Sequence, residues 1–223
     1  MDANWQRSVF SGCSSLEEVK NFLGVKRIPE YMFSGCENLT TINLSSVTQL
    51  YSACFRNCTS LDFITSGLDF SNITYLADYV FEGCQQLTGE IELPNLTNTA
   101  MSRAFVSTGI TKISNIPSLT SIGGGDNRNI GMFNSCLNLK TIDLQLSTSL
   151  TTVGTWLFAT NRNAISAIEK IVLPSSVTSI EEYVVPIDGD GRSNPNFHGI
   201  ILWATTPPTM MANYNTASTS LSL

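Results

Sequence analysis

The sequence predicts a repeat solenoid, in which short strands and turns stack into one continuous coil. Three observations support this prediction: a Phe-Cys-Leu anchor recurs along the chain, its copies are evenly spaced, and further apolar positions keep the same register. A single repeat of this length cannot bury its apolar edge alone. Stacked neighbours supply the missing wall, so the repeats are expected to form one coil.

The anchor is a Phe followed after three residues by Cys and after three more by Leu. Five copies are complete: Phe10-Cys13-Leu16, Phe33-Cys36-Leu39, Phe55-Cys58-Leu61, Phe81-Cys84-Leu87 and Phe133-Cys136-Leu139. Two copies without Cys begin at Phe105 and Phe158, and Val185 stands where an eighth anchor would fall. Successive anchors lie 22 to 28 residues apart, within the range of leucine-rich repeats. We therefore expect seven to eight such repeats.

Two further columns accompany the anchor. Five residues before it stand Trp5, Ile28, Leu50, Leu76, Ala100, Val153 and Ile180, with Ile122 in the same role. Nine residues after it stand Val19, Ile42, Ile64 and Ile142. Residues 39–44 end in the alternation that predicts a strand, whereas residues 29–33 are expected to form a short helical or 3-10 turn that directs Phe33 inward.

Together with the pairs Leu93-Pro94 and Leu173-Pro174 and the ending at residues 200–208, these columns resemble the BspA-like leucine-rich repeats. That family is found in surface and secreted proteins of gut and oral bacteria and in some protists. The resemblance therefore implies a bacterial source and an extracellular or cell-surface location. It covers residues 9–208, so we expect one leucine-rich-repeat solenoid over residues 1–208 and a tail or incomplete cap over residues 209–223. Glycine-rich residues 123–129 are expected to interrupt the sixth repeat.

Composition excludes several classes of partner. The net charge is −6 and only 13% of residues are charged. Nucleic-acid binding needs clustered Lys and Arg, so no nucleic-acid partner is expected. No apolar stretch approaches the length of about 18 residues that a membrane span requires, and residues 1–5 do not resemble a secretory signal. Any signal or anchor would therefore lie outside this chain. A monomer is compatible with everything in the sequence.

The six cysteines are predicted to be buried free thiols. Five occupy the anchor column and Cys54 precedes an anchor Phe, while Thr108 and Asn161 replace Cys in two repeats. A buried thiol can donate weakly to a turn carbonyl. Parallel stacking would hold neighbouring Cβ atoms farther apart than a disulfide prefers, so crosslinks are not expected.

No catalytic or metal-binding constellation is evident. His198 is the sole histidine, and we expect it in a solvated loop. Residues 123–126 lack the Lys of a phosphate loop. Residues 188–192 match a calcium loop only in part, and residues 188–195 are expected to form a loop insertion. Glu90, Glu92 and Asp143 fall in different coils rather than as a facing pair. We therefore predict no cofactor, no metal and no enzymatic activity.

What remains is an exposed row of side chains beside the inward residues of the strands. The candidate partner-binding positions are Asn43, Thr65, Glu92, Ser114, Asp143 and Val172. Solenoids use such extended surfaces to bind proteins or glycans, although polar sheet faces are also common without a partner. The sequence thus favours an adhesion module for an unidentified protein or glycan, and a purely architectural spacer is the alternative.

Overall fold

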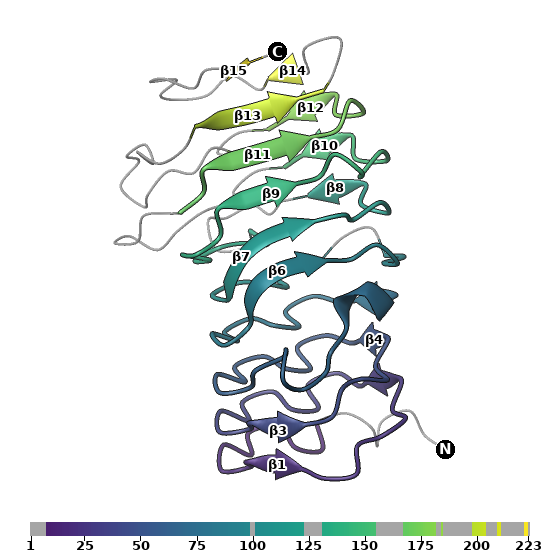
Figure 1. Cartoon of the computed structure of the whole chain (residues 1–223), viewed down its shortest axis with the longest axis vertical. Coiled ribbons are helices and arrows are strands. Elements are labelled where there is room, and N and C mark those ends of the chain that lie inside the picture. Colours follow the sequence, from purple (N-terminus) through teal and green to yellow (C-terminus); the bar gives the residue numbers. More distant parts are fainter. Residues whose placement is uncertain are drawn as a thin grey trace.

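In the computed structural model the chain is an elongated stack of coils, with β1 and β15 at opposite ends (Figure 1). Every strand pairing within the described residues is parallel. Parallel neighbours need a long crossover, and here one turn of the coil provides it. This arrangement confirms the predicted repeat solenoid. The structure describes residues 8–98, 101–122, 131–154, 167–181, 184, 198–203, 209–210 and 221–222.

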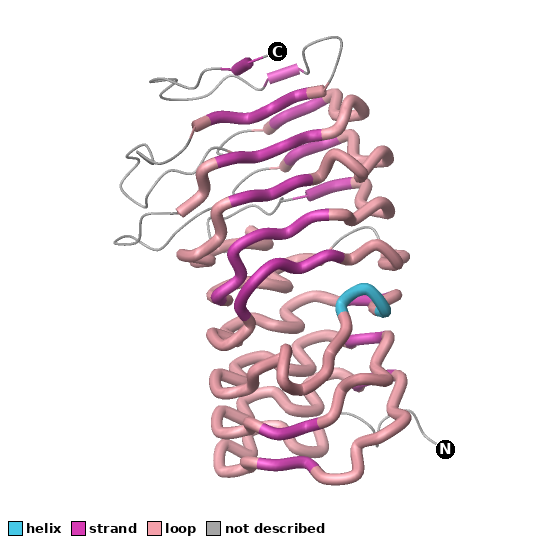
Figure 2. Tube along the Cα trace, viewed as in Figure 1, coloured by secondary structure: helices cyan, strands magenta, loops and turns pink. Residues whose placement is uncertain are grey.

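One wall of the coil is a six-stranded sheet, which we call the long sheet, in the order β15-β13-β11-β9-β7-β6. Its strands are β6 (Thr88–Glu92), β7 (Gly109–Ser114), β9 (Thr141–Asp143), β11 (Lys170–Leu173), β13 (Gly199–Leu202) and β15 (Leu221–Ser222). Toward the N-terminus the same side carries only the pair β1 (Glu18–Val19) and β3 (Thr41–Ile42). Figure 2 shows the long stretch of loop that separates this pair from β6.

A second wall lies behind the long sheet and is also divided in two. Its N-terminal part is β2 (Arg27–Ile28), β4 (Gln49–Leu50) and β5 (Tyr75–Leu76), and its C-terminal part is β8 (Ser121–Ile122), β10 (Thr152–Val153), β12 (Ser179–Ile180) and β14 (Thr209–Met210). The predicted column five residues before the anchor lies in register here. Ile28 aligns with Leu50 and Leu76, and all three are buried. This part of the repeat assignment is confirmed for these residues, whereas Trp5 and Ala100 of the same column lie outside the described residues.

The third wall follows the Phe anchors and is built from turns; we call it the turn wall. Among its described residues there is no helix, so the expected helical turn at residues 29–33 is wrong. Tyr31 and Gly35, on either side of Phe33, have φ of 56° and 76°. Left-handed residues at both places prevent a right-handed helix from continuing. The same pair recurs at Ser8 and Gly12, Ala53 and Asn57, Tyr79 and Gly83, and Arg103 and Ser107.

Hydrogen bonds explain why turns suffice in this wall. The backbone N–H groups of Tyr31, Phe33 and Gly35 donate to carbonyl oxygens of the next coil at 2.7 to 3.0 Å. The intervening N–H groups of Met32 and Ser34 donate to carbonyl oxygens within their own turn. Alternate N–H groups therefore serve neighbouring coils, and the buried backbone is satisfied without helix or strand.

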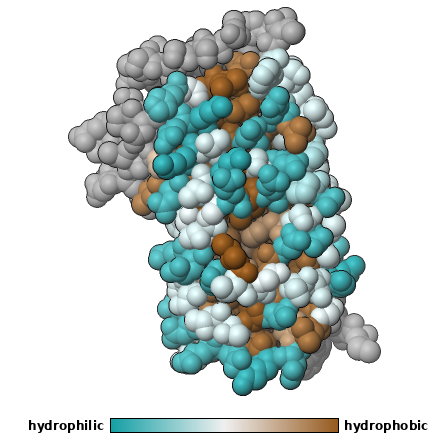
Figure 3. Space-filling model, viewed as in Figure 1, coloured by the Kyte–Doolittle hydropathy of each residue, from teal (hydrophilic) through white to brown (hydrophobic). Residues whose placement is uncertain are grey.

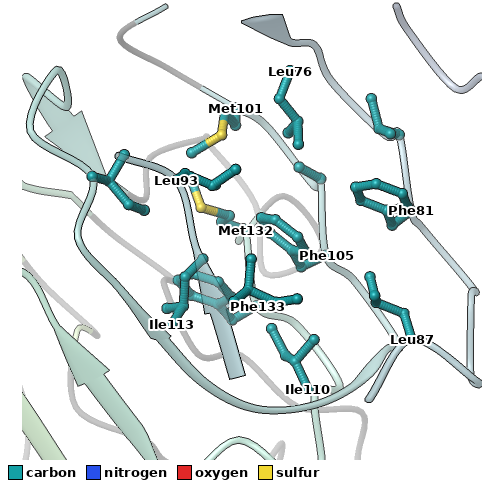
Figure 4. Close-up of a cluster of buried hydrophobic side chains, with 14 of the residues drawn as sticks. Leu76, Phe81, Leu87, Leu93, Met101, Phe105, Ile110, Ile113, Met132 and Phe133 are labelled. Atoms are coloured by element: carbon teal, nitrogen blue, oxygen red, sulfur yellow. The ribbon is translucent and has the colours of Figure 1, made fainter. Parts of the chain in front are cut away.

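The anchor rings stack along the interior of the turn wall. Successive centroids lie 5.5, 5.5, 6.3, 5.8 and 6.1 Å apart along Phe10, Phe33, Phe55, Phe81, Phe105 and Phe133. Figure 4 shows Phe81, Phe105 and Phe133 in one cluster with apolar side chains such as Leu93 and Ile113. Burying each ring contributes about 1.5–3 kcal/mol, and ring pairs add about 0.5–1.5 kcal/mol. The stack is thus a continuous apolar core.

The cysteine column lies beside this stack. The thiols of Cys36, Cys58, Cys84 and Cys136 donate to the carbonyl oxygen of the anchor Phe in the preceding coil, at 2.8 to 3.1 Å. All six cysteines are free, as predicted, but only five are buried: Cys13, in the first described coil, is exposed. Burial raises the pKa of Cys36 and Cys136 to about 11. These thiols are therefore protonated at neutral pH and are poor nucleophiles.

The third coil departs from the predicted pattern. Ile64, predicted to face inward, is 68% exposed, whereas Phe63 is 1% exposed. The ring of Phe63 meets those of Phe55 and Phe81 edge-on at 5.4 and 4.9 Å. A Phe ring buries more apolar area than an Ile side chain, so the aromatic residue takes the interior position and Ile64 is displaced to the surface.

A 3-10 helix, η2 (Phe70–Asn72), follows this turn. The side chain of Asp69 accepts a hydrogen bond from the N–H of Ser71 at 2.9 Å, as expected for a helix cap. Within the described residues a 3-10 helix thus occurs here rather than at the Phe anchors.

Strands β14 and β15 extend both sheets beyond residue 208, the expected end of the solenoid. The insertions at residues 123–129 and 188–195 lie outside the described residues, as do Phe158 and Val185. The partial calcium motif at residues 188–192 falls in the same part of the chain.

Candidate functional site

Four of the six predicted binding residues form a row across the long sheet. Glu92 on β6 aligns with Ser114 on β7, which aligns with Asp143 on β9 and through it with Val172 on β11. Alternate residues of a strand point to opposite faces, and the neighbouring Ile91, Ile113, Ile142 and Ile171 are buried. The row therefore belongs to the outer face of the long sheet.

This row is less open than expected. Glu92 is exposed and Asp143 is half-buried, but Ser114 and Val172 are only 7% and 4% exposed. The hydroxyl of Ser114 donates to Oε1 of Glu92 at 3.4 Å. Directly opposed side chains in neighbouring strands lie close enough to cover one another. The expectation that all members of the row are exposed is thus wrong for Ser114 and Val172.

The remaining two predicted residues do not join the row. Asn43 directly follows β3, in the separate pair of strands near the N-terminus. Thr65 does not lie in a strand, contrary to expectation. Its N–H donates to Oδ1 of Asp62 at 3.4 Å, and Asp62 also accepts the N–H of Ile64. This side-chain turn replaces the strand, so Thr65 and Asn43 are exposed but isolated from the row.

Two of the predicted residues have structural roles as well. Oδ1 of Asn43 accepts the N–H of Ser45 at 3.0 Å, and Oδ1 of Asp143 accepts the N–H of Gln145 at 3.2 Å. Both are side-chain turns of the kind that end a strand. The choice of Asn and Asp at these positions is therefore explained in part by the fold itself.

Sequence reasoning missed a second outward row on the long sheet. In register across β6, β7, β9 and β11 it consists of Glu90, Lys112, Thr141 and Lys170. The Nζ atom of Lys112 lies 3.2 Å from Oε2 of Glu90, and a flanking pair joins Lys140 to Glu169 at 3.5 Å. The sequence did contain a signal for this row, because Glu90 stands two residues before Glu92 and alternate residues of a strand share a face. The outer face thus carries acidic and basic side chains beside apolar patches (Figure 3).

The geometry offers little for catalysis. His198 is exposed, as predicted. Within the described ranges, no group of three or more His, Cys, Asp or Glu side chains could hold a metal ion. Glu90 and Glu92 lie on β6 and Asp143 on β9, with β7 between them, so these carboxylates share an open sheet face.

Among the described residues, no helix has the length and apolar character needed to cross a membrane.

Comparison with known proteins identifies the repeat. The chain matches the BspA type leucine rich repeat region in six copies, over residues 4–129 and 65–185. A solved structure described as a leucine rich cell surface protein from Faecalibacterium prausnitzii A2-165 is similar, with a TM-score of 0.46 and 20% sequence identity. The similarity covers 87% of this chain and 69% of that chain. No curated protein matches the sequence.

Proposed function

Since the chain belongs to the BspA-type leucine-rich-repeat family, we propose that it is a non-enzymatic binding module of a bacterial cell-surface or secreted protein. Its outer face on the long sheet would bind a host or neighbouring-cell protein or glycan. The module would act outside the cell or at its surface.

The observation that supports this proposal is the pair of in-register rows on the long sheet. Neighbouring strands lie about 4.8 Å apart, so the four strands that carry these rows present a regular array that is wide enough to contact a macromolecule. Charges of both signs lie on it, with Glu90, Glu92 and Asp143 beside Lys112 and Lys170. Such mixed faces provide specificity through charge complementarity rather than through a deep pocket.

A spacer function is the second candidate, and a specific observation favours it. Ser114 and Val172 are buried within the row, and Asn43 and Asp143 are engaged in strand-ending turns. Much of the predicted surface is thus explained by the architecture. A module that only separates two other domains would require nothing more.

A binding screen separates the two functions. The purified chain is tested at physiological salt against a panel of host matrix proteins and a glycan array. Glu92→Arg is the test variant because Glu92 is exposed and its side chain forms no turn. Glu37→Arg, a charge reversal at another exposed position outside the long sheet, is the matched control.

The proposal predicts saturable binding that Glu92→Arg weakens at least tenfold and Glu37→Arg leaves unchanged. Binding that both variants retain would move the site away from the outer face. The absence of any binding partner in both panels would contradict the adhesion function and favour the spacer.

A further inference from the structure

An open depression lies on the second wall, near the place where β5 ends its sheet. It has a volume of about 390 Å³ and is lined by Glu30, Tyr51, Ser52, Tyr75, Ala77, Asp78 and Asn98. None of the described lining residues is Lys or Arg. This surface lies away from the long sheet, and the proposed function above does not use it.

The depression lies at the edge of the sheet β2-β4-β5. Among the described residues, β5 has no strand partner beyond β4. The side-chain amide of Asn98 instead bonds the backbone of Leu76: its Oδ1 accepts the N–H of Leu76 at 3.1 Å, and its Nδ2 donates to the Leu76 carbonyl oxygen at 2.7 Å. Ala77 follows β5 as Tyr51 follows β4 in the preceding coil, and it contributes a small side chain to the lining.

Two tyrosines form an aromatic platform within it. The ring centroids of Tyr51 and Tyr75 are 5.2 Å apart with an interplanar angle of 40°, and both residues are half-buried. The Tyr51 hydroxyl donates to Oε1 of Gln49 at 3.4 Å, which limits the movement of that ring. Aromatic side chains that keep their polar end in solvent present an apolar surface, and they lose little conformational entropy when a ligand binds.

Hydrogen-bonding groups stand beside this platform. Oδ1 of Asp78 accepts the N–H of Ser102 at 2.7 Å, so the carboxylate is oriented, and its Oδ2 makes no hydrogen bond with the described residues. The hydroxyl of Ser52 donates to the Asp78 carbonyl oxygen at 3.2 Å, which leaves its oxygen able to accept. Fixed acceptors beside apolar rings match a ligand that has a C–H face and hydroxyl donors at its edge.

We propose that this depression, formed by Tyr51, Tyr75, Ser52, Ala77 and Asp78, is a binding site for a neutral pyranose unit of a glycan. The C–H face of the sugar would pack on the tyrosine rings, and its hydroxyls would donate to Asp78. Negatively charged sugars are disfavoured because Glu30 and Asp78 are both carboxylates. A cationic side chain could also bind to tyrosine rings and carboxylates. The experiment below therefore includes a cationic probe beside the neutral sugars.

The test is titration of the full chain with cellotriose, mannotriose and N-acetylchitotriose as neutral probes, sialyllactose as the anionic probe and trilysine as the cationic probe. Saturation-transfer NMR and calorimetry detect binding. We expect at least one neutral trisaccharide to bind with a Kd on the order of 1 mM, and sialyllactose to bind at least tenfold more weakly.

Variants locate the site. Tyr75→Ala removes half of the platform, and Ala77→Leu fills the depression without removing a polar group, so each should weaken binding at least tenfold. Trp203→Ala removes an aromatic residue that is 55% exposed on the long-sheet side and should change nothing. Ala77→Leu keeps the test decisive if Tyr75→Ala fails to fold.

The proposal is overturned if no neutral probe binds at about 10 mM, if trilysine binds and the sugars do not, or if Ala77→Leu binds as the original chain does. Glu92→Arg, which tests the outer face, should leave this saccharide binding intact. Loss of macromolecular binding in that variant with unchanged sugar binding would show that the two surfaces act separately.

Discussion

The turn wall and the strand walls differ in how they tolerate irregular sequence. The anchor rings stack without a gap from Phe10 to Phe133, with centroid distances of 5.5 to 6.3 Å. The described strands of each strand wall form two separate sheets, with the turn at Asp62 in one gap and the Asn98 amide at the edge of β5 in the other. The register of the coil is therefore maintained by the turn wall, and the strand walls are free to vary.

The same difference places the residues that stabilise the fold and the candidate binding surfaces on different walls. The turn wall uses its side chains for stacking and for thiol hydrogen bonds, which leaves few of them for a partner. Both candidate binding surfaces lie on strand walls, one on the regular long sheet and one where the second wall stops. In repeat proteins variation on one face with a constant core is the usual way to change a binding surface.

The largest effect should follow from breaking the ring stack at its centre. Phe81→Ala removes a fully buried ring that meets four others, and should lower the free energy of unfolding by about 3–5 kcal/mol. Urea denaturation measures this change. Phe10→Ala, at the half-buried end of the stack, is the control and should cost less. Equal losses would argue against a cooperative stack.

A smaller effect should appear at alkaline pH, because burial raises the pKa of Cys136 to about 11 from an ordinary value of 9.0. Below pH about 9 the thiol is protonated in both states, and its contribution to stability is complete. As the pH rises toward 11 the unfolded thiol ionises first, so stability falls by roughly 1.4 kcal/mol per pH unit.

Cys136→Ser is the control for this dependence. Its unfolding free energy should fall less between pH 9 and 11 than that of the original chain, because a serine hydroxyl does not ionise there. Indistinguishable pH profiles would show that the buried thiol contributes nothing to alkaline stability.

Alanine substitutions at two glycines of the turn wall should distinguish the energetic cost of backbone strain from that of a steric clash. Gly12 and Gly83 have φ of 75° and 80°, but a Cβ at Gly12 meets nothing within 4 Å, whereas one at Gly83 would lie 2.3 Å from Oδ1 of Asn57. Gly12→Ala should cost about 1 kcal/mol from the left-handed conformation alone. Gly83→Ala should cost more, by thermal or urea denaturation, unless the Asn57 side chain can rotate away without loss.

The smallest effect should occur in the interrupted coil. Ile64→Ser should change the unfolding free energy by less than about 0.5 kcal/mol because the side chain is exposed. Phe63→Ser, one residue earlier, should destabilise by several times as much. A large loss of stability in Ile64→Ser would indicate that Ile64 faces the interior, as the sequence pattern predicted, and would contradict the observed structure.

Much of the architecture follows from periodicity in the sequence. The anchor and the column five residues before it define the turn wall and the second wall, because apolar residues at a constant spacing have to meet in a stack. The cysteine hydrogen bonds could also be expected, since a buried thiol has few other donors or acceptors available to it.

The predictions that the structure contradicts failed for physical reasons that a pattern of repeated columns does not reveal. Phe63 displaced Ile64 because two adjacent apolar residues compete for one interior position and the larger ring makes more contacts. The helical turn at residues 29–33 was wrong because Tyr31 adopts a left-handed conformation that its residue type does not signal. The burial of Ser114 and Val172 depends on the neighbouring strands, and the tyrosine depression lies beside an Asn side chain that bonds the backbone of Leu76.

The claim that the turn wall keeps the register of the whole coil is tested most directly by native-state amide hydrogen exchange. The informative groups are the N–H groups of Phe33, Phe55, Phe81 and Phe105, which donate to the next coil on both sides of the interruption at residues 62–66. We predict that all four exchange with similar free energies of opening, as one cooperative unit. Two classes of protection divided at residues 62–66 would contradict the account, because the interrupted strand wall would then set the limits of cooperativity.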